Sequence, residues 1–274
     1  MSKLICESDA QVPILRAKLD HFYRDFSDYN AFRSPSNVAH FWPLLIPAID
    51  AVCRRRETCR ILEFGAGRTG FARTLLDHGL RKKVNFTTHD ITDKNRLWLE
   101  QEADAICIGG VPAITGEYDV IFSTFVLEHM TDPQESLSHL WTLLASGGTL
   151  VVTCPRYDLP FYLPPSCDHL KFMDRLALAV KLLGWRTRTL LTGTPAFRLL
   201  DDLAMFHLPW AQDRDAVHLV SYYDLRAFFR RRGGRVKRGR NIFGGTIRDL
   251  LSWGGVKDWI VKRYLTVCLQ ADRN

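Results

Sequence analysis

The sequence lacks the features of a membrane-spanning, secreted or disordered protein. Its longest nearly apolar stretch runs from Phe41 to Val52, well short of the roughly 20 residues that a membrane span needs. The first residues contain no apolar core of the kind found in a secretory signal. With 46% hydrophobic and 24% charged residues, the composition also excludes a low-complexity chain. We therefore expect a folded cytoplasmic protein without a membrane span.

Metal-binding spacing of cysteine and histidine is also absent. The seven cysteines form no C-x-x-C motif, and none pairs with a histidine at the separation typical of zinc sites. We expect reduced thiols and no bound metal. Nothing in the sequence fixes the oligomeric state.

Excess charge is confined to one short segment. The chain has a formal net charge of +7, and the segment from Arg230 to Arg240 alone holds seven basic residues and no acidic one. Proteins that coat nucleic acid usually spread basic residues over a whole face, so no stable nucleic-acid partner is expected. Two interpretations of the run remain: a solvated strand edge kept from aggregating by its charge, or a contact for an anionic acceptor or surface.

Short apolar runs alternate with helix-length segments from Arg60 onward, which is typical of a parallel sheet built from strand–helix–strand units. Residues 1–58 show helical periodicity instead. The pattern predicts an α/β protein with an open, doubly wound sheet of seven strands. The expected strands are Arg60–Phe64, Val84–His89, Ala105–Ile108, Tyr118–Ser123, Thr149–Cys154, Arg235–Asn241 and Tyr264–Ala271.

Four segments of the chain follow from this alternation. Residues 1–58 are expected to form an N-terminal helical cap, and residues 59–155 the ligand-binding core. Residues 156–216, rich in proline and aromatic residues, interrupt the alternation and are expected to form an inserted lid that binds the acceptor. Residues 217–274 complete the core.

A glycine-rich turn follows the first expected strand. Gly65, Gly67 and Gly70 let the backbone turn sharply and approach a ligand, a pattern that suits NAD as readily as another adenosine-containing ligand. Glu63 precedes the first of these glycines. A carboxylate there repels a pyrophosphate and attracts an ammonium group, which favours S-adenosylmethionine.

Four stretches carry a family resemblance, and they occur in the order EFGAGRTG at 63–70, THDIT at 88–92, YDVIFSTFVLEHMTDP at 118–133 and LLASGGTLVVTCP at 143–155. Together they resemble the class I S-adenosylmethionine-dependent methyltransferases of the small-molecule type. The resemblance is specific over about residues 58–155 and looser over 217–274. It implies a Rossmann-like, seven-stranded, doubly wound sheet whose last strand is antiparallel. It also implies S-adenosylmethionine as cofactor and S-adenosylhomocysteine as product.

The resemblance also implies roles for individual residues. It places Glu63, Gly65, Ala66 and Gly67 around the methionyl part of the cofactor, and Ser123, Thr124 and Phe125 opposite its sulfonium centre. The ribose falls to Asp90, although Asp90 can also be interpreted as a helix cap. The neighbouring Ile91 is expected to contact the cofactor as well. Where many relatives have an acidic residue that binds adenine, this chain has Gly109-Gly110, so adenine recognition falls to the backbone of Ile108 and Gly109.

Candidate bases follow the fourth and fifth strands. His129 lies just after the strand that faces the cofactor, and Asp168 with His169 lies in the insertion. A positioned histidine or carboxylate can take the proton that a hydroxyl acceptor loses. Each can also be interpreted without a catalytic role. His129 is then a structural residue, and Asp168 and His169 are solvated loop residues. Cys154 is interpreted as a buried strand residue rather than a nucleophile.

The function expected from these residues is methyl transfer to a hydroxyl of a small molecule, such as a glycan, lipid or specialised-metabolite intermediate, which can be anionic. Two alternatives remain from other classes. One is a methyltransferase acting on RNA or protein, supported only by the basic run. The other is a catalytically silent cofactor-binding protein, suggested by the missing acidic residue after the third strand.

Overall fold

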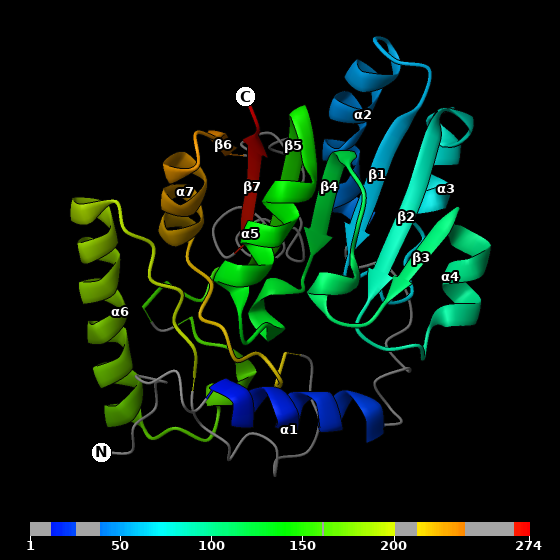
Figure 1. Ribbon diagram of the computed structural model, residues 1–274. Coiled ribbons are helices and arrows are strands. Elements are labelled where there is room, and N and C mark those ends of the chain that lie inside the picture. The colour runs from blue at the N-terminus through cyan, green and yellow to red at the C-terminus, as the bar shows by residue number, and fades with distance from the viewer. Residues whose placement is uncertain (1–11, 26–38, 161, 201–212, 239–265) are drawn as a thin grey trace, which may run out of the picture.

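A seven-stranded sheet forms the centre of the computed structural model, which describes residues 12–25, 39–160, 162–200, 213–238 and 266–274 (Figure 1). The strand order is β3-β2-β1-β4-β5-β7-β6. Strands β1 to β5 pair in parallel, and β7 is antiparallel to both of its neighbours. The strands are β1 (Cys59–Phe64), β2 (Val84–Asp90), β3 (Ala105–Ile108), β4 (Tyr118–Thr124), β5 (Leu144–Pro155), β6 (Arg235–Arg238) and β7 (Thr266–Asp272).

Helices cover both faces of the sheet (Figure 1). The α-helices are α1 (Val12–Asp25), α2 (Ile46–Cys53), α3 (Phe71–Asp77), α4 (Arg96–Glu102), α5 (Pro133–Leu143), α6 (Phe172–Thr192) and α7 (Tyr222–Arg231). Single turns of 3-10 helix, η3 to η7, lie at Ala39–Leu44, Arg81–Lys83, Val111–Ala113, Leu127–His129 and Pro165–Cys167. Local sequence sets several of these ends: Ser221 caps α7 by accepting hydrogen bonds from the backbone N–H groups of Tyr223 and Asp224, and Gly193 ends α6 in the left-handed conformation.

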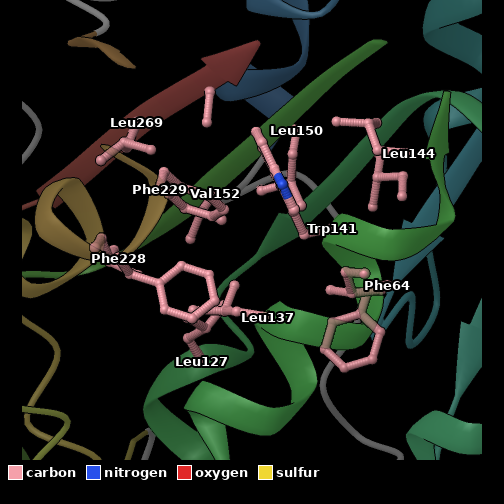
Figure 2. Close-up of a cluster of buried hydrophobic side chains, with 14 of the residues drawn as sticks. Phe64, Leu127, Leu137, Trp141, Leu144, Leu150, Val152, Phe228, Phe229 and Leu269 are labelled. Carbon is pink, nitrogen blue, oxygen red and sulfur yellow. The ribbon is translucent and has the colours of Figure 1, made fainter. Parts of the chain in front are cut away.

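Two hydrophobic cores lie on opposite faces of the sheet. On one face, Leu137 and Trp141 of α5 and Phe228 and Phe229 of α7 pack against inward-facing residues of β4, β5 and β7 (Figure 2). On the other face, α2 and α3 cover β1, β2 and β4, with Phe71 buried at the centre. Because strands buried on both faces read as nearly continuous apolar runs, the sequence pattern located them well.

The carboxyl ends of the parallel strands form the edge where ligands bind in such sheets. The strand order reverses between β1 and β4, the switch point at which open α/β sheets leave a crevice. Helix α1 runs across this edge (Figure 1). Its residues Leu15, Leu19 and Tyr23, four apart, form a buried stripe that packs with Val217.

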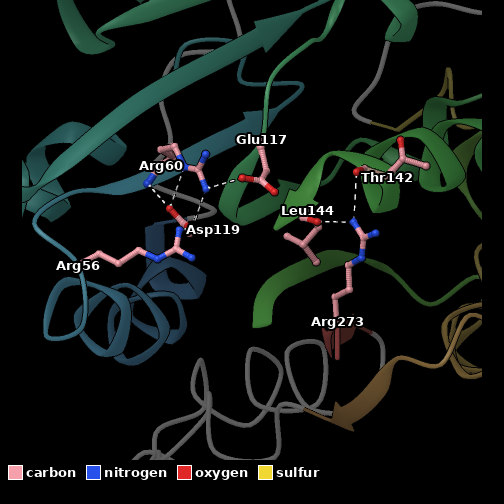
Figure 3. A network of polar contacts seen from close by, with 7 residues as sticks. All are labelled: Arg56, Arg60, Glu117, Asp119, Thr142, Leu144 and Arg273. Atoms are coloured by element: carbon pink, nitrogen blue, oxygen red, sulfur yellow. Dashed lines mark hydrogen bonds and ion pairs between the residues drawn. The ribbon is translucent and has the colours of Figure 1, made fainter. Parts of the chain in front are cut away.

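The opposite edge of the sheet is held by charged groups. Asp119 at the start of β4 is buried and accepts hydrogen bonds from the side chains of Arg56 and Arg60 and from the Arg60 backbone N–H (Figure 3). Near the C-terminus, the Arg273 guanidinium donates to the carbonyl oxygens of Trp141, Thr142 and Leu144, where α5 joins β5. These contacts fasten the ends of α2, β4, α5 and β7 to one another.

The predicted fold class is confirmed, and every predicted strand has a counterpart. Strand β5 begins at Leu144 rather than Thr149, because Leu144 already pairs with Tyr118 and the chain passes from α5 into the strand without a separate turn. A side chain at Gly148 would lie 2.8 Å from the carbonyl oxygen of Ala145, so this close approach requires glycine.

Two further predictions compare differently with the structure. The insertion contains a 21-residue helix, α6, that its prolines and aromatic residues did not reveal. The predicted end of the sixth strand, residues 239–241, and the predicted start of the seventh, residues 264–265, lie outside the described residues. No helix in the described part of the chain is long and apolar enough to cross a membrane. The four-segment division and the cytoplasmic location stay predictions.

Candidate active site

The glycine turn after β1 brings the backbone close to its neighbours. Gly65 and Gly67 have φ values of +73° and +54°, which residues with a side chain rarely adopt. A Cβ atom at Gly65 would lie 2.4 Å from a methyl carbon of Val126, so the loop beyond β4 also forbids one. The Ala66 N–H donates to the His89 carbonyl oxygen at 2.8 Å and anchors the turn on β2.

Buried polar atoms gather at the carboxyl ends of β1 and β4. Glu63 is 4% exposed, and among the described residues its Oε2 has no hydrogen-bond partner. The Ser123 hydroxyl, on the adjacent strand, is likewise buried without a described partner. Burial raises the pKa of Glu63 to about 8. Unsatisfied groups of this kind indicate where a polar or cationic ligand fits.

Asp90 is the last residue of β2, and its carboxylate contacts the loops that follow β1 and β2. Its Oδ1 accepts a hydrogen bond from the Thr92 N–H at 3.2 Å. Burial raises the pKa of Asp90, while hydrogen bonds from Thr92, Asn95 and the Gly67 backbone oppose the shift. Helix α4 starts only at Arg96, with Asn95 as its N-cap residue, so Asp90 does not cap that helix. The ribose role of Asp90 and the cofactor contact of Ile91 stay predictions.

The end of β3 is held by a histidine rather than by an acidic residue. The Gly109 N–H donates to the Asp90 carbonyl oxygen at 3.0 Å. The His89 ring stacks on Phe64 at 4.8 Å, and its Nε2 lies 2.8 Å from the Gly109 carbonyl oxygen. Burial lowers the pKa of His89 to about 4, so the ring is neutral and donates its Nε2–H to that carbonyl. This bond fixes the backbone of Gly109, one of the two predicted adenine-binding residues.

The segment after β4 adopts a strained turn. Phe125 has a φ of +56°, uncommon for a bulky residue, and its N–H donates to the Thr153 carbonyl oxygen of β5 at 2.8 Å. Its ring lies 5.5 Å from that of Phe41. The turn therefore presents Ser123, Thr124 and Phe125 at the carboxyl edge of the sheet.

His129 lies in a cluster of carboxylates that the sequence does not reveal. Its Nδ1 lies 3.2 Å from Oδ2 of Asp215, and its Nε2 lies 4.0 Å from Oε1 of Glu128. The Tyr23 hydroxyl of α1 donates to the same Asp215 oxygen at 2.9 Å. Asp213 lies beside them and accepts a hydrogen bond from the Tyr157 hydroxyl at 2.9 Å. Four distant parts of the chain thus meet at one histidine.

The charges in this cluster shift one another's protonation. Burial by itself lowers the pKa of His129, but Asp215, Glu128 and Asp213 outweigh it and raise the pKa to about 10. Burial raises the pKa of Glu128 to about 8 despite the nearby imidazole. Burial favours a raised pKa for Asp215 as well, yet the positive charge of His129 outweighs it and the net shift is downward. His129 and Asp215 therefore form an ion pair at neutral pH.

The other candidates lie at the surface or deep in the sheet. Asp168 and His169 are exposed, and Asp168 lies 3.7 Å from Arg175 and 3.8 Å from Arg214. Cys154 is fully buried, and burial raises the pKa of its thiol. In the basic run, Arg231 and Arg232 donate to hydroxyls of Thr194 and Ser138. The catalytic roles of His129, Asp168 and His169 stay predictions.

Sequence reasoning missed Tyr23, Glu128, Asp213 and Asp215. Glu128 stands beside the candidate His129, and Asp213 and Asp215 flank an arginine in QDRDAVH. Neither pattern has a spacing that points to His129. Asp213 takes a φ of +58°, a conformation that aspartate tolerates better than most residues.

A family model described as a methyltransferase domain matches residues 15–233 of the chain. A curated relative, the non-reducing polyketide synthase esdpA of Penicillium shearii, is 27% identical over 194 residues. That alignment covers 64% of this chain but only 8% of the relative's length.

Solved structures show the same fold. The plantazolicin methyltransferase BpumL, in complex with a pentazolic desmethylPZN analog and SAH, superposes with a TM-score of 0.54 and 14% identity. The match covers 97% of this chain and 98% of that one. An S-adenosylmethionine-dependent methyltransferase from Mesorhizobium loti has a TM-score of 0.50 and 14% identity, over 84% and 97% of the two chains.

Proposed function

The chain belongs to the methyltransferase-domain family, and from this premise we propose that it transfers a methyl group from S-adenosylmethionine to a hydroxyl group of a small molecule. The cofactor supplies the methyl group on a positively charged sulfonium sulfur. The observation that supports a hydroxyl acceptor is the buried His129–Asp215 pair beyond β4. A hydroxyl is too weak an acid to lose its proton without such a group.

The residues at the carboxyl edge fit this cofactor. The carboxylate of Glu63, whose Oε2 has no described partner, would bind the amino group of the methionyl part. The positive φ values of Gly65 and Gly67 leave room for close backbone approach. Asp90 would accept hydrogen bonds from the ribose hydroxyls, and Gly109, fixed by His89, would contact adenine through its backbone.

His129 would receive the proton of the acceptor hydroxyl. Asp215 engages Nδ1, which leaves Nε2 to face the acceptor. The bound cofactor would supply the methyl group, and Nε2 of His129 would take the proton that the acceptor hydroxyl loses. An imidazole accepts a proton only when neutral, and a cationic ligand nearby lowers the pKa of His129 toward that state. We therefore expect His129 to act as a base only when the cofactor is bound.

A second candidate is methyl transfer to carbon. The match to a polyketide synthase favours it, because polyketide chains carry acidic carbons beside carbonyl groups. The same His129–Asp215 pair could remove a proton from such a carbon. The two candidates differ in the atom that carries the product's methyl group.

Methyl transfer from ¹³C-methyl-labelled S-adenosylmethionine to a panel of phenols, sugars, alcohols and 1,3-dicarbonyl compounds tests the proposal, with products identified by carbon NMR. We expect an oxygen-bound methyl group, and a turnover lowered by about 10²–10⁴-fold in His129→Gln. Calorimetric titration should show that this variant still binds the cofactor. A carbon-bound methyl group, or full activity of His129→Gln, would overturn the proposal.

A further inference from the structure

The cluster around His129 is arranged as a metal site. Glu128, His129 and Asp213 each offer one ligand atom, and these atoms all lie within 4.8 Å of one another. We propose that these three residues bind a divalent cation, with zinc as the best match to their chemistry. The ligands come from η6 and from the segment before α7, far apart in sequence, which is why motif spacing predicted no metal.

Glu128 supplies the strongest support for a cation. Its side chain has no solvent exposure, and neither carboxylate oxygen accepts a hydrogen bond from another described residue. A buried carboxylate without hydrogen-bond partners is costly, and a bound cation removes that cost. The position is nevertheless tightly fixed, since the Glu128 carbonyl oxygen accepts hydrogen bonds from both Val217 and His218, each at 2.8 Å.

The surroundings also match an outer shell of a metal site. Metal-binding histidines usually engage a carboxylate with the ring nitrogen that is not bound to the metal. Here Asp215 lies at Nδ1 of His129 and is itself held by the Tyr23 hydroxyl. Asp213 is held by the Tyr157 hydroxyl through Oδ2, which leaves Oδ1 for an ion.

Zinc binds both imidazole and carboxylate ligands, and a site with three protein ligands leaves its fourth position open. Magnesium prefers oxygen ligands alone and is a poorer match. Zinc ligands at about 2.0–2.2 Å from the ion lie roughly 3.4 Å apart, so the side chains would close by about 1 Å. The side chain of His129 is 16% exposed, which gives an ion access to the cluster.

A bound cation would occupy Nε2 of His129, the atom to which the acceptor proton is assigned. This consequence rests on the proposed function: zinc and base catalysis would exclude each other, so excess zinc should inhibit methyl transfer and a chelator should restore it. Zinc binding itself is measured without any acceptor. Failure of the hydroxyl proposal and failure of the metal proposal are therefore distinguishable.

Calorimetric titration of the chelator-treated, reduced full chain with zinc chloride tests the site. We expect one zinc ion per chain, with binding weakened at least tenfold in Glu128→Gln and in Asp213→Asn. The outer-shell variant Asp215→Asn should lose about 10–100-fold in affinity. Titration with cobalt(II) should give a visible spectrum of nitrogen and oxygen ligation, without a thiolate charge-transfer band.

The matched control is Glu135→Gln, which removes an exposed carboxylate on neighbouring α5 and should leave zinc affinity unchanged. Cofactor binding and thermal unfolding report whether each variant is folded, and Asp213→Asn decides the test if Glu128→Gln does not fold. No binding to the wild-type chain would overturn the proposal. So would zinc binding that both ligand variants retain, or a thiolate band in the cobalt spectrum.

Discussion

Single buried carboxylates set the chemistry of this protein. Glu63, Asp90, Glu128 and Asp213 all lie near the carboxyl edge of the sheet, and burial raises the pKa of each. Burial favours the neutral form of each acid, and a positive charge nearby would favour the charged form instead. Where a ligand provides that charge, binding and protonation become coupled.

The first prediction concerns Glu63. Its pKa of about 8 means that the free protein holds it largely protonated at pH 7, whereas an ammonium group favours the carboxylate. Affinity for S-adenosylmethionine should therefore rise with pH up to about 8, and binding at pH 7 should release a proton. Calorimetry in two buffers of different ionisation enthalpy measures that release. Glu63→Gln should bind at least about tenfold more weakly and release no proton from this site; unchanged proton release in the variant would contradict the assignment.

The second prediction concerns the pair of His129 and Asp215. NMR titration of the ring protons should show His129 protonated to above pH 9, because the carboxylates raise its pKa to about 10. Asp215→Asn should move the midpoint toward the ordinary value of about 6.5. The resonance is identified by its absence in His129→Gln.

The raised pKa of His129 also makes stability depend on pH. The protonated ring stabilises the fold fully at a pH below the pKa of the unfolded state, and that stabilisation is lost as the pH rises through the pKa of the folded state. The stability gap between wild type and Asp215→Asn should therefore shrink toward pH 10.

At the scale of elements, α1 connects the N-terminal segment to the site. Its apolar stripe packs beneath the carboxyl edge, and Tyr23 reaches Asp215. The insertion contributes Tyr157 and Asp213 to the same place. The site is therefore completed by segments outside the strands, and its geometry depends on how firmly α1 is docked.

The third prediction compares a buried and an exposed aliphatic residue of α1. Leu19 is 3% exposed, whereas Ile14 is 55% exposed. Leu19→Ala should weaken docking by about 2–3 kcal/mol, because it removes buried apolar contacts. Hydrogen exchange of the α1 amides should then accelerate at least about tenfold, while amides of β1 and β4 stay protected. Ile14→Ala should exchange as the wild type does. Equal acceleration in the two variants would show that α1 is not held by its apolar stripe.

At the scale of the whole molecule, contacts on both faces of the sheet and at the amino-terminal ends of its strands hold it in place. Two apolar cores cover its faces, and charged groups tie the amino-terminal ends of its central strands to α2. Asp119 is the centre of that tie and is 3% exposed. Burial favours a raised pKa for Asp119, but hydrogen bonds from Arg60 outweigh it and lower the pKa.

The fourth prediction follows from that lowered pKa. Asp119→Asn should reduce the free energy of unfolding by about 2–3 kcal/mol at pH 7, since it weakens several charge-assisted hydrogen bonds at a buried position. Because the pKa of Asp119 is lower in the folded than in the unfolded state, the charged carboxylate stabilises the fold at a pH above its unfolded pKa of about 3.9. That stabilisation is lost as the pH falls through the folded-state pKa. Urea unfolding should therefore show the gap at pH 7 narrowing below pH 4. The control Glu117→Gln removes an ion-pair partner of Arg60 that is 59% exposed, and should cost less than about 1 kcal/mol.

The sequence by itself determined the seven strands of the sheet and the glycine turn at its carboxyl edge. Buried parallel strands read as short apolar runs, and Glu63 with Gly65 and Gly67 marks the turn after the first of them. These signals are local, because strand burial, turn geometry and a strand's end depend on residues close in the chain.

Only the tertiary structure decided what surrounds His129. Tyr23, Asp213 and Asp215 share no spacing with it and are brought together by the docking of α1 and the return of the insertion. Helix α6 was hidden for a related reason, since the prolines on both sides of it suggested irregular structure. Contacts between distant segments depend on packing in three dimensions, and local residue preferences do not encode them.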